Sequence, residues 1–360
     1  MSADTRPHSA PAEAVSVLAV MGMTKNTGKT VALNHLLAQA AQAQVAAGVT
    51  SIGRDGEDRD MVFFIPKPPI LVWPGTLVAT ARATLQRAKV RYKLVDTTGI
   101  DSPMGEVLVV KVLEYGEMEI AGASRSSDQL KVIGRLKQCG AALVLLDGAL
   151  GRSHHASPAI ADGVILATGA AIGGGIPDVI RKTRDRLAIL GLAQADGATR
   201  ARCESVFANG GVGLWNSRGE PLLLAEIATL NAAPTLLRFA EDDVATVAVS
   251  GAVGRALWGA LSTLAARRSG LTIVVNDGTK LFIDATDLAQ LRKLGAQVLA
   301  WRAIVMIGIT LNPFSPLGGS FDAREFLAQA RAAFTHYAVS DVMLEQQHPD
   351  AARTEVESTT

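Results

Sequence analysis

The chain has 360 residues, 48% of them hydrophobic and 19% charged, a composition that argues for well-filled globular cores and against extended disorder. A chain of this length has room for two domains of ordinary size. Its 35 basic and 34 acidic side chains leave a formal net charge of +1 without long blocks of one sign, so no nucleic-acid partner is predicted.

Runs of β-branched residues alternate with Ala/Leu-rich helical patterns, which predicts an α/β fold with a mostly parallel sheet flanked by helices. One stretch breaks the alternation: two extended runs flank "EYGE", so we expect a hairpin on the sheet edge over 106–123. In chain order the pattern predicts strands at 15–21, 48–53, 69–73, 90–96, 141–147 and 163–168, and helices at 28–44, 75–88, 127–138 and 177–190.

A Gly-rich stretch at 208–221 then interrupts the pattern, and "NAAPT" follows at 231–235, which predicts a domain boundary close behind. Beyond it the pattern indicates strands at 246–250, 271–277 and near 297 and 304, with helices at 252–267 and 286–294. The predicted division is a disordered tail at 1–13, a larger domain at 14–236, a smaller C-terminal α/β domain at 237–345 and a disordered tail at 346–360.

Aliphatic runs such as "AIVMIGITL" at 303–311 are much shorter than the roughly 20 residues that span a bilayer, so we expect no membrane span. The polar N-terminal residues include no basic cluster and precede an apolar run too short for a secretion signal, which predicts a cytoplasmic protein. Cys139 and Cys203 lie in unrelated segments without CxxC spacing. We expect buried thiols there, not a disulfide framework or a zinc site.

The stretch "GMTKNTGKT" at 22–30 lies between the first apolar strand and an amphipathic helix. Glycines let backbone N–H groups converge on a phosphate, a lysine neutralises its charge, and a hydroxyl can ligate Mg²⁺. The helix that follows adds the positive end of its dipole. An ordinary strand-to-helix turn is the alternative. The larger domain is therefore predicted to be a P-loop NTPase that binds ATP and Mg²⁺ through Gly22, Thr24, Lys25, Asn26, Thr27, Gly28, Lys29 and Thr30.

Five residues separate Gly22 from Gly28, one more than in the standard GxxxxGK[ST] loop. This spacing resembles the loop of dethiobiotin synthetase, and MinD-like ATPases have a loop of the same length. Lys25 resembles the extra loop lysine of the MinD group but lies one place later. ATP is expected rather than GTP because no NKxD motif follows a strand.

Acidic residues at the carboxyl ends of parallel strands are candidates to bind metal or position water. Asp55 follows the second strand, Asp147 ends "LVLLD", and Asp96 with Gly99 forms a DxxG pattern, in which the aspartate reaches the Mg²⁺ shell and the glycine N–H meets the γ-phosphate. Helix capping and turn formation are the alternatives. The predicted catalytic residues are Lys29, Asp96 and Asp55; the predicted metal ligands are Thr30, Asp96 and Asp147; and Gly99 joins the nucleotide-binding set.

Two further features favour simpler interpretations. The adjacent pair His154 and His155 follows the Asp147 segment but has no acidic partner at ligand spacing, so surface histidines are expected. Asn312 precedes a proline in "ITLNPFSP" and is predicted to form a turn, with a hydrogen bond to a base or partner as the alternative.

Several stretches together resemble the reactivase subunit of lysine 5,6-aminomutase, over most of residues 15–343. They are "MTKNTGKT", "TSIGRDGE", "PGTLVATA", "GIDSPMGEV", "VNDGTKLFI" and "ITLNPFSPLGG". The resemblance implies an ATPase that uses ATP binding and hydrolysis to remodel an adenosylcobalamin- and pyridoxal-phosphate-dependent aminomutase and release damaged cobalamin. The segments after Asp55 and Asp96 would be its switches. The mutase would be its partner, and the loop class is compatible with a homodimer across the nucleotide.

Two other functions remain open from the residues. A biosynthetic ATP-dependent ligase or kinase of the dethiobiotin synthetase type shares the loop spacing. A regulatory module that binds nucleotide without hydrolysing it would share the loop as well. In each case the loop at 22–30 is the common element, and the three differ in what accelerates turnover.

Overall fold

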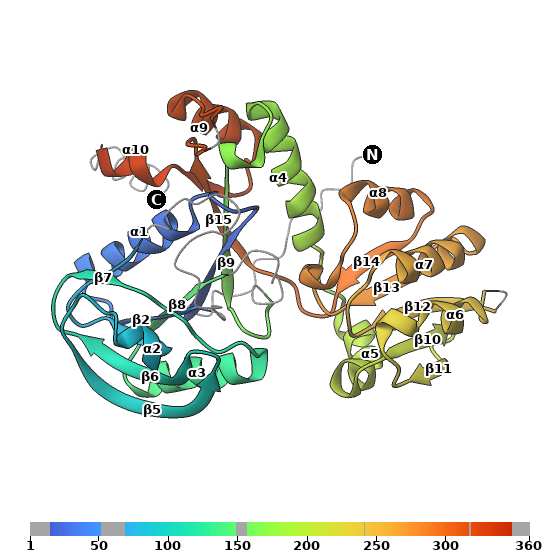
Figure 1. The fold of residues 1–360 in the computed structure, drawn as a ribbon. Helices are drawn as coiled ribbons and strands as arrows, with labels where there is room; N and C mark the ends of the chain where they lie inside the picture. The colour runs from blue at the N-terminus through green and yellow to red at the C-terminus, as the bar shows by residue number, and fades with distance from the viewer. Residues whose placement is uncertain (1–14, 52–68, 149–156, 241, 317, 348–360) are drawn as a thin grey trace.

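The computed structural model describes residues 15–51, 69–148, 157–240, 242–316 and 318–347 (Figure 1). They form an α/β fold in which a large, mostly parallel sheet is flanked by helices, which confirms the predicted fold class at that level. A five-stranded sheet and a two-stranded sheet complete the architecture. No helix within the described ranges combines the length and apolar character needed to cross a membrane.

We call the nine-stranded sheet and its helices the larger unit. Its strands are β1 (Val17–Gly22), β2 (Ala47–Ser51), β4 (Leu77–Ala81), β5 (Tyr92–Ser102), β6 (Gly105–Val112), β8 (Leu143–Asp147), β9 (Gly163–Gly169), β15 (Met306–Asn312) and β16 (Ala338–Ser340). The strand order is β16-β15-β9-β1-β8-β2-β4-β6-β5. Neighbours from β16 to β4 are parallel, whereas β6 is antiparallel to both β4 and β5.

Helices cover both faces of this sheet. They are α1 (Lys29–Gln42), α2 (Arg82–Leu85), α3 (Ser126–Gln138), α4 (Ile176–Leu190), α9 (Ala323–Ala333) and α10 (Val342–Gln347). Leu33 and Leu37, one helical turn apart on α1, are buried in one cluster with Leu18 and Val20 of β1. Alternate residues such as Ala19 face a second cluster under α3, α4 and α9. Burial of each such leucine contributes about 1.5–3 kcal/mol.

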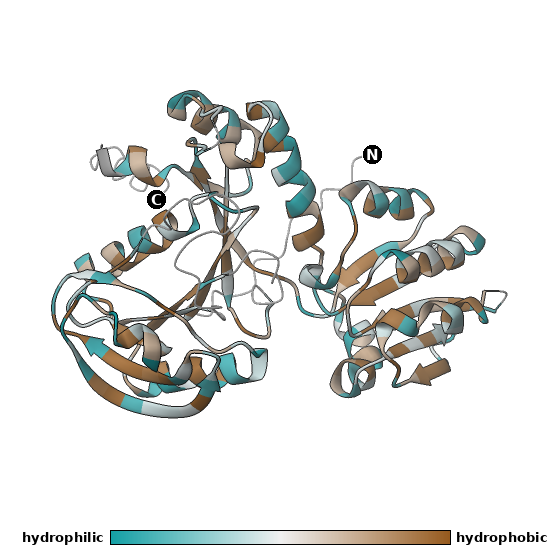
Figure 2. Ribbon diagram, in the orientation of Figure 1, coloured by the Kyte–Doolittle hydropathy of each residue, from teal (hydrophilic) through white to brown (hydrophobic). Residues whose placement is uncertain are grey.

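The five-stranded sheet and its helices form the smaller unit. Its strand order is β11-β10-β12-β13-β14, with β12, β13 and β14 parallel and β10 antiparallel to its neighbours. Figure 2 shows hydrophobic residues concentrated along the strands of both sheets. The elements are α5 (Gly197–Asn209), β10 (Val212–Asn216), β11 (Pro221–Ala225), α6 (Ala233–Leu237), β12 (Val244–Val249), α7 (Arg255–Arg267), β13 (Thr272–Val275), the 3₁₀ helix η4 (Gly278–Lys280), α8 (Ala285–Lys293) and β14 (Gln297–Ala300).

Sheet membership differs from the predicted domain boundary at 236/237. β10 and β11 precede that boundary yet belong to the smaller sheet, and β15 and β16 follow it yet belong to the larger sheet. The Gly-rich stretch at 208–221 contains β10 and the turn that leads to its antiparallel partner β11, and Gly210, Gly211 and Gly219 have the positive φ angles that its turns require. These glycines do not mark a linker between domains. The smaller unit is thus inserted between α4 and β15 of the larger one.

Most predicted elements are confirmed to within a few residues, but the strand predicted to end at Asp96 continues to Ser102, and two other elements are wrong. The stretch 75–88 was expected to be a helix, but 77–81 forms β4 and only 82–85 is helical. The expected hairpin over 106–123 is absent from the described residues, because β6 turns back from β5, and β7 (Gly116–Met118) pairs with β3 (Ile70–Val72). Every residue of β4 is buried, so its sequence lacks the alternation that marks a half-exposed strand.

The first strand is anchored at its start by Asp162. One carboxylate oxygen accepts hydrogen bonds from Ser16 N at 3.0 Å, Ser16 Oγ at 2.8 Å and Val17 N at 2.9 Å. Burial alone would raise the pKa of Asp162, but these hydrogen bonds and nearby Lys137 outweigh it and lower the pKa. The charged carboxylate therefore stabilises the folded chain.

Asp162→Ala should lower the free energy of unfolding at pH 7 by roughly 1 kcal/mol, the scale of exposed hydrogen bonds to a charged group. The pKa of Asp162 in the folded chain lies below its ordinary value of 3.8. The contribution to the free energy of unfolding is therefore fully present above that ordinary value and is lost as the pH falls below it through the lowered pKa. Urea unfolding of wild type and variant at pH 7 and pH 3 measures the difference. Asp185→Ala, which removes an exposed ion pair with Arg181, is the control and should change little. A pH-independent difference for Asp162→Ala would contradict this account.

Candidate functional site

Residues 23–28 connect β1 to α1 and form a compact loop over the carboxyl end of β1. Met23 N donates to Ala167 O at 2.9 Å, which fastens the start of the loop to β9. Thr27 Oγ1 donates to Thr24 O at 2.9 Å across the loop. Asn26 and Gly28 have positive φ angles of 62° and 87°, which turn the backbone sharply into the helix.

The loop and the start of α1 present groups of the kind that bind anions. The backbone N–H groups of Asn26, Thr27 and Gly28 have no acceptor among the described residues. The first turn of α1 includes no acidic residue and no side-chain cap, so its dipole is open to a ligand. Gly22 leaves space for the side chains of Lys29 and Thr27, because a Cβ at position 22 would lie 2.7 Å from Lys29 Cδ and 2.8 Å from Thr27 Oγ1. Converging amides at a helix N-terminus are the arrangement that phosphate groups require.

Lys29 extends along the carboxyl edge of the sheet toward β8. Its Nζ donates to the carbonyl oxygen of Gly148 at 2.6 Å, and Gly148 N donates in turn to Val20 O at 3.1 Å. The ammonium group therefore lies where β1 and β8 end. An anion in the loop would compete with the Gly148 carbonyl for this ammonium group.

The sheet topology favours a ligand at this same place. From β1 the chain passes through α1 to β2 on one side, whereas from β9 it passes through α4 and the smaller unit to β15 on the other. Ligands in open α/β sheets bind at the carboxyl edge where neighbouring connections diverge. The loop at 23–28 stands at that point.

The structure brings Asp147 to the loop. Asp147 is the last residue of β8, where it is in register with Val20 of β1 and Ser51 of β2. It is half-buried and directly precedes Gly148, the acceptor for Lys29. Thr30 is the second residue of α1. The predicted residues Lys29, Thr30 and Asp147 therefore share one edge of the sheet.

Asp96 and Gly99 do not reach the loop. β5 is five strands away from β1 in the sheet, which at about 4.8 Å per strand is about 24 Å. Asp96 accepts from Thr97 N and lies 3.6 Å from Arg135 Nη1, while Gly99 N donates to Glu106 Oε1 at 3.1 Å. The predicted strand end at Asp96 is wrong, because pairing with β6 extends β5 to Ser102. The DxxG interpretation is corrected accordingly.

Other candidates fall outside this edge. Asp55, His154 and His155 lie outside the described residues. Cys203 is buried as expected, and burial raises the pKa of its thiol to about 11, whereas Cys139 is only partly buried. Within the described ranges, no group of three or more His, Cys, Asp or Glu side chains is arranged to hold a metal ion by itself.

The sequence singled out Asn312 but did not place it at the loop. Asn312, at the carboxyl end of β15, donates from Nδ2 to Asn26 O at 2.8 Å. It also forms the predicted turn, because its Oδ1 accepts from Phe314 N at 3.2 Å. An asparagine at the end of an apolar strand and before a proline was the available signal, but nothing local connects it to the loop.

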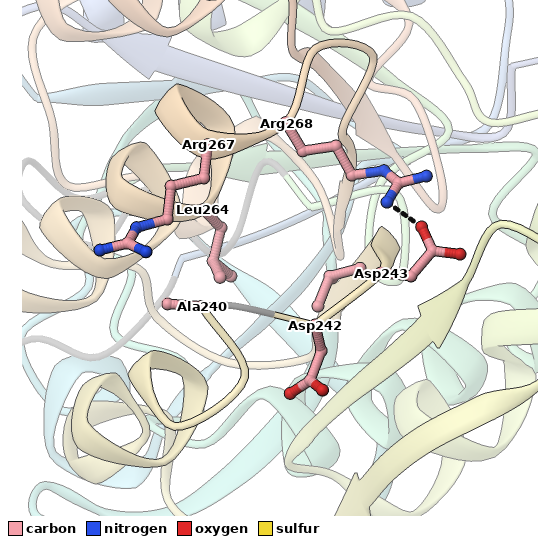
Figure 3. Close-up of a pocket in the computed structure, with 7 residues that line it drawn as sticks. Ala240, Asp242, Asp243, Leu264, Arg267 and Arg268 are labelled. Atoms are coloured by element: carbon pink, nitrogen blue, oxygen red, sulfur yellow. Dashed lines mark ion pairs between the residues drawn. The ribbon is translucent and has the colours of Figure 1, made fainter.

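Figure 3 shows a pocket in the smaller unit, lined by residues from the end of α7 and from the segment that leads from α6 into β12. Arg268 forms an ion pair with Asp243, which also accepts from Ser217 Oγ. These contacts engage the Asp243 carboxylate and join the residue before β12 to the residue after α7. The pocket includes none of the loop residues. Its lining is Ala240, Asp242, Asp243, Val244, Leu264, Arg267 and Arg268.

The chain matches no protein-family model, and searches of curated proteins and of solved structures likewise give no significant match.

Gly22→Ala should weaken the binding of inorganic tripolyphosphate about tenfold or more. The added methyl group would lie 2.7 Å from Lys29 Cδ, so the lysine must move from its place at the sheet edge. Isothermal titration calorimetry measures the affinity, where tenfold is about 1.4 kcal/mol. The control is Gly254→Ala at the strand-to-helix junction before α7, where a Cβ meets no atom within 4 Å. Equal affinities for Gly22→Ala and wild type would contradict an anion-binding site in the loop at 22–30.

Proposed function

We propose that this protein binds MgATP at the loop of residues 22–30 and hydrolyses it. The observation that carries the proposal is the meeting of open loop amides, Lys29, Thr30 and Asp147 at one edge of the sheet, at the point where the connections diverge. Each group has the chemistry that a triphosphate and a hard divalent cation require.

The roles of the residues follow from their places. The N–H groups of Asn26, Thr27 and Gly28 would bind phosphate oxygens, and Lys29 would exchange the Gly148 carbonyl for phosphate. The Thr30 hydroxyl and the Asp147 carboxylate would hold Mg²⁺, which prefers a few protein oxygens alongside phosphate and water. The cation, when bound, neutralises charge that develops on the transferred phosphoryl group.

We extend the proposal to a reactivating factor for an adenosylcobalamin- and pyridoxal-phosphate-dependent aminomutase, on the basis of the sequence resemblance. ATP can drive such work only if nucleotide states favour different conformations of the protein or its client. The smaller unit is attached at the amino edge of the larger sheet, because it follows α4 and precedes the first residue of β15, which pairs with the start of β9. Ser157 Oγ, in the segment before β9, donates to the buried Asp277 of the smaller unit at 2.7 Å. The extension therefore rests on the sequence resemblance and not on closeness of the smaller unit to the loop.

Asp147→Asn should retain nucleotide binding and lose ATP hydrolysis by about a hundredfold or more, the usual cost of removing one group that stabilises transition-state charge. Lys29→Ala should abolish measurable ATP binding. Asp96→Asn is the control and should hydrolyse ATP at the wild-type rate, because β5 lies far from the loop. Phosphate release and calorimetry measure the two properties. If Asp96→Asn lost hydrolysis and Asp147→Asn did not, the metal role would return to Asp96.

ATP turnover measured with and without a purified cobalamin-dependent aminomutase tests the client. A reactivating ATPase should be slow alone and several-fold faster with mutase that contains damaged cobalamin. Acceleration by a small carboxylic acid or amine, and none by the mutase, would favour a biosynthetic ligase or kinase. Binding without turnover under every condition would identify a regulatory module and refute the ATPase.

A further inference from the structure

Asn312 connects the far side of the larger sheet to the phosphate loop. It is the last residue of β15, which is separated from β1 by β9, and 286 positions separate it from Asn26. Nδ2 donates to Asn26 O at 2.8 Å, and Oδ1 accepts from Phe314 N at 3.2 Å. A carbonyl partner at one end and an N–H partner at the other fix the orientation of the side-chain amide.

Two glycines make room for this side chain. A Cβ at Gly28 would lie 3.0 Å from Asn312 Cβ, so the asparagine packs directly against the loop backbone. A Cβ at Gly169 would lie 2.2 Å from Asn312 O, so only glycine lets β9 and β15 approach closely enough there. Asn312 is therefore packed into place from both sides.

The hydrogen bond from Asn312 sets the direction of one peptide group in the loop. In a planar trans peptide, the C=O of Asn26 and the N–H of Thr27 point in opposite directions. Since Asn312 holds the Asn26 carbonyl toward β15, the Thr27 N–H points away from β15, and it has no acceptor among the described residues. Asn26 has a left-handed φ of 62°, which costs about 1 kcal/mol in a residue with a side chain and needs such support.

We propose that Asn312 is a positioning residue that fixes the peptide between Asn26 and Thr27 so that the Thr27 N–H faces the phosphate-binding side of the loop. This inference rests on the proposed function for its effect on nucleotide affinity. The tether itself can be tested without nucleotide. In this proposal Asn312 acts on the phosphates through the loop backbone, and its effect does not depend on the base of the nucleotide.

The experiment compares wild type with Asn312→Ala and the isosteric Asn312→Asp. Asn34→Ala is the matched control, because the Asn34 amide also bridges two backbone groups, Pro69 O at 3.0 Å and Leu71 N at 2.9 Å, away from the loop. Affinities for inorganic tripolyphosphate and for ATP are measured by calorimetry. Asn312→Ala should lower the affinity for both ligands by the same factor of about ten, as expected for the loss of one hydrogen bond. Asn312→Asp should lose more, because an oxygen then faces the Asn26 carbonyl.

Tryptic cleavage after the exposed Lys25, followed by mass spectrometry without nucleotide, reports on the tether alone. Cleavage should be several-fold faster in both Asn312 variants and unchanged in Asn34→Ala. Unchanged cleavage, or wild-type affinity for tripolyphosphate, would overturn the inference, and a loss for ATP alone would reassign Asn312 to the base. If wild type bound neither ligand, the proposed function would fail while faster cleavage would still support the tether.

Discussion

The position of β1 between β8 and β9 is the constraint on which the site depends. Parallel pairing places the carboxyl ends of all three strands at one edge, so a single loop contacts both neighbours. Met23 bonds to β9 on one side, and Lys29 reaches the residue after β8 on the other. With β1 at the edge of the sheet, one of these two contacts would be missing.

The loop combines strain with support. A backbone that exposes several N–H groups to an anion cannot satisfy them internally, and its turn needs residues at positive φ. Thr27 and Asn312 offset that cost through hydrogen bonds to loop carbonyls, which leaves the N–H groups available. In this loop the carbonyl groups accept hydrogen bonds from the protein, while N–H groups on the opposite side of the peptides stay unpaired among the described residues. For the proposed nucleotide, the loop would therefore already be ordered before binding.

The features that could be predicted from the sequence are those that a local pattern of residues determines. The alternation of strands and helices and the glycine, lysine and threonine of the loop follow from short-range rules, and these placed Lys29, Thr30 and Asp147 correctly at strand or helix ends. Features set by long-range pairing were not predictable. Asp96 was taken for a strand end because only the register with β6 shows that β5 continues.

The same limit explains the domain boundary and Asn312. Whether β15 joins the smaller or the larger sheet depends on its pairing with β9, more than 130 positions earlier in the chain, which no local signal encodes. The contact from Asn312 to the loop spans 286 positions and exists only once that pairing has formed. β4 was missed for a different reason, since a strand buried on both faces has no period to detect.

The chain enters and leaves the smaller unit at neighbouring points. Gln194 and Ala300 form an isolated parallel bridge, and Ala195 N and Ala193 O both bond to the backbone of Ala300. A segment whose two ends lie side by side can be gained or lost as a block without changing the order of strands in its host. The smaller unit can therefore be gained or lost in evolution while the loop at 23–28 and its sheet stay the same.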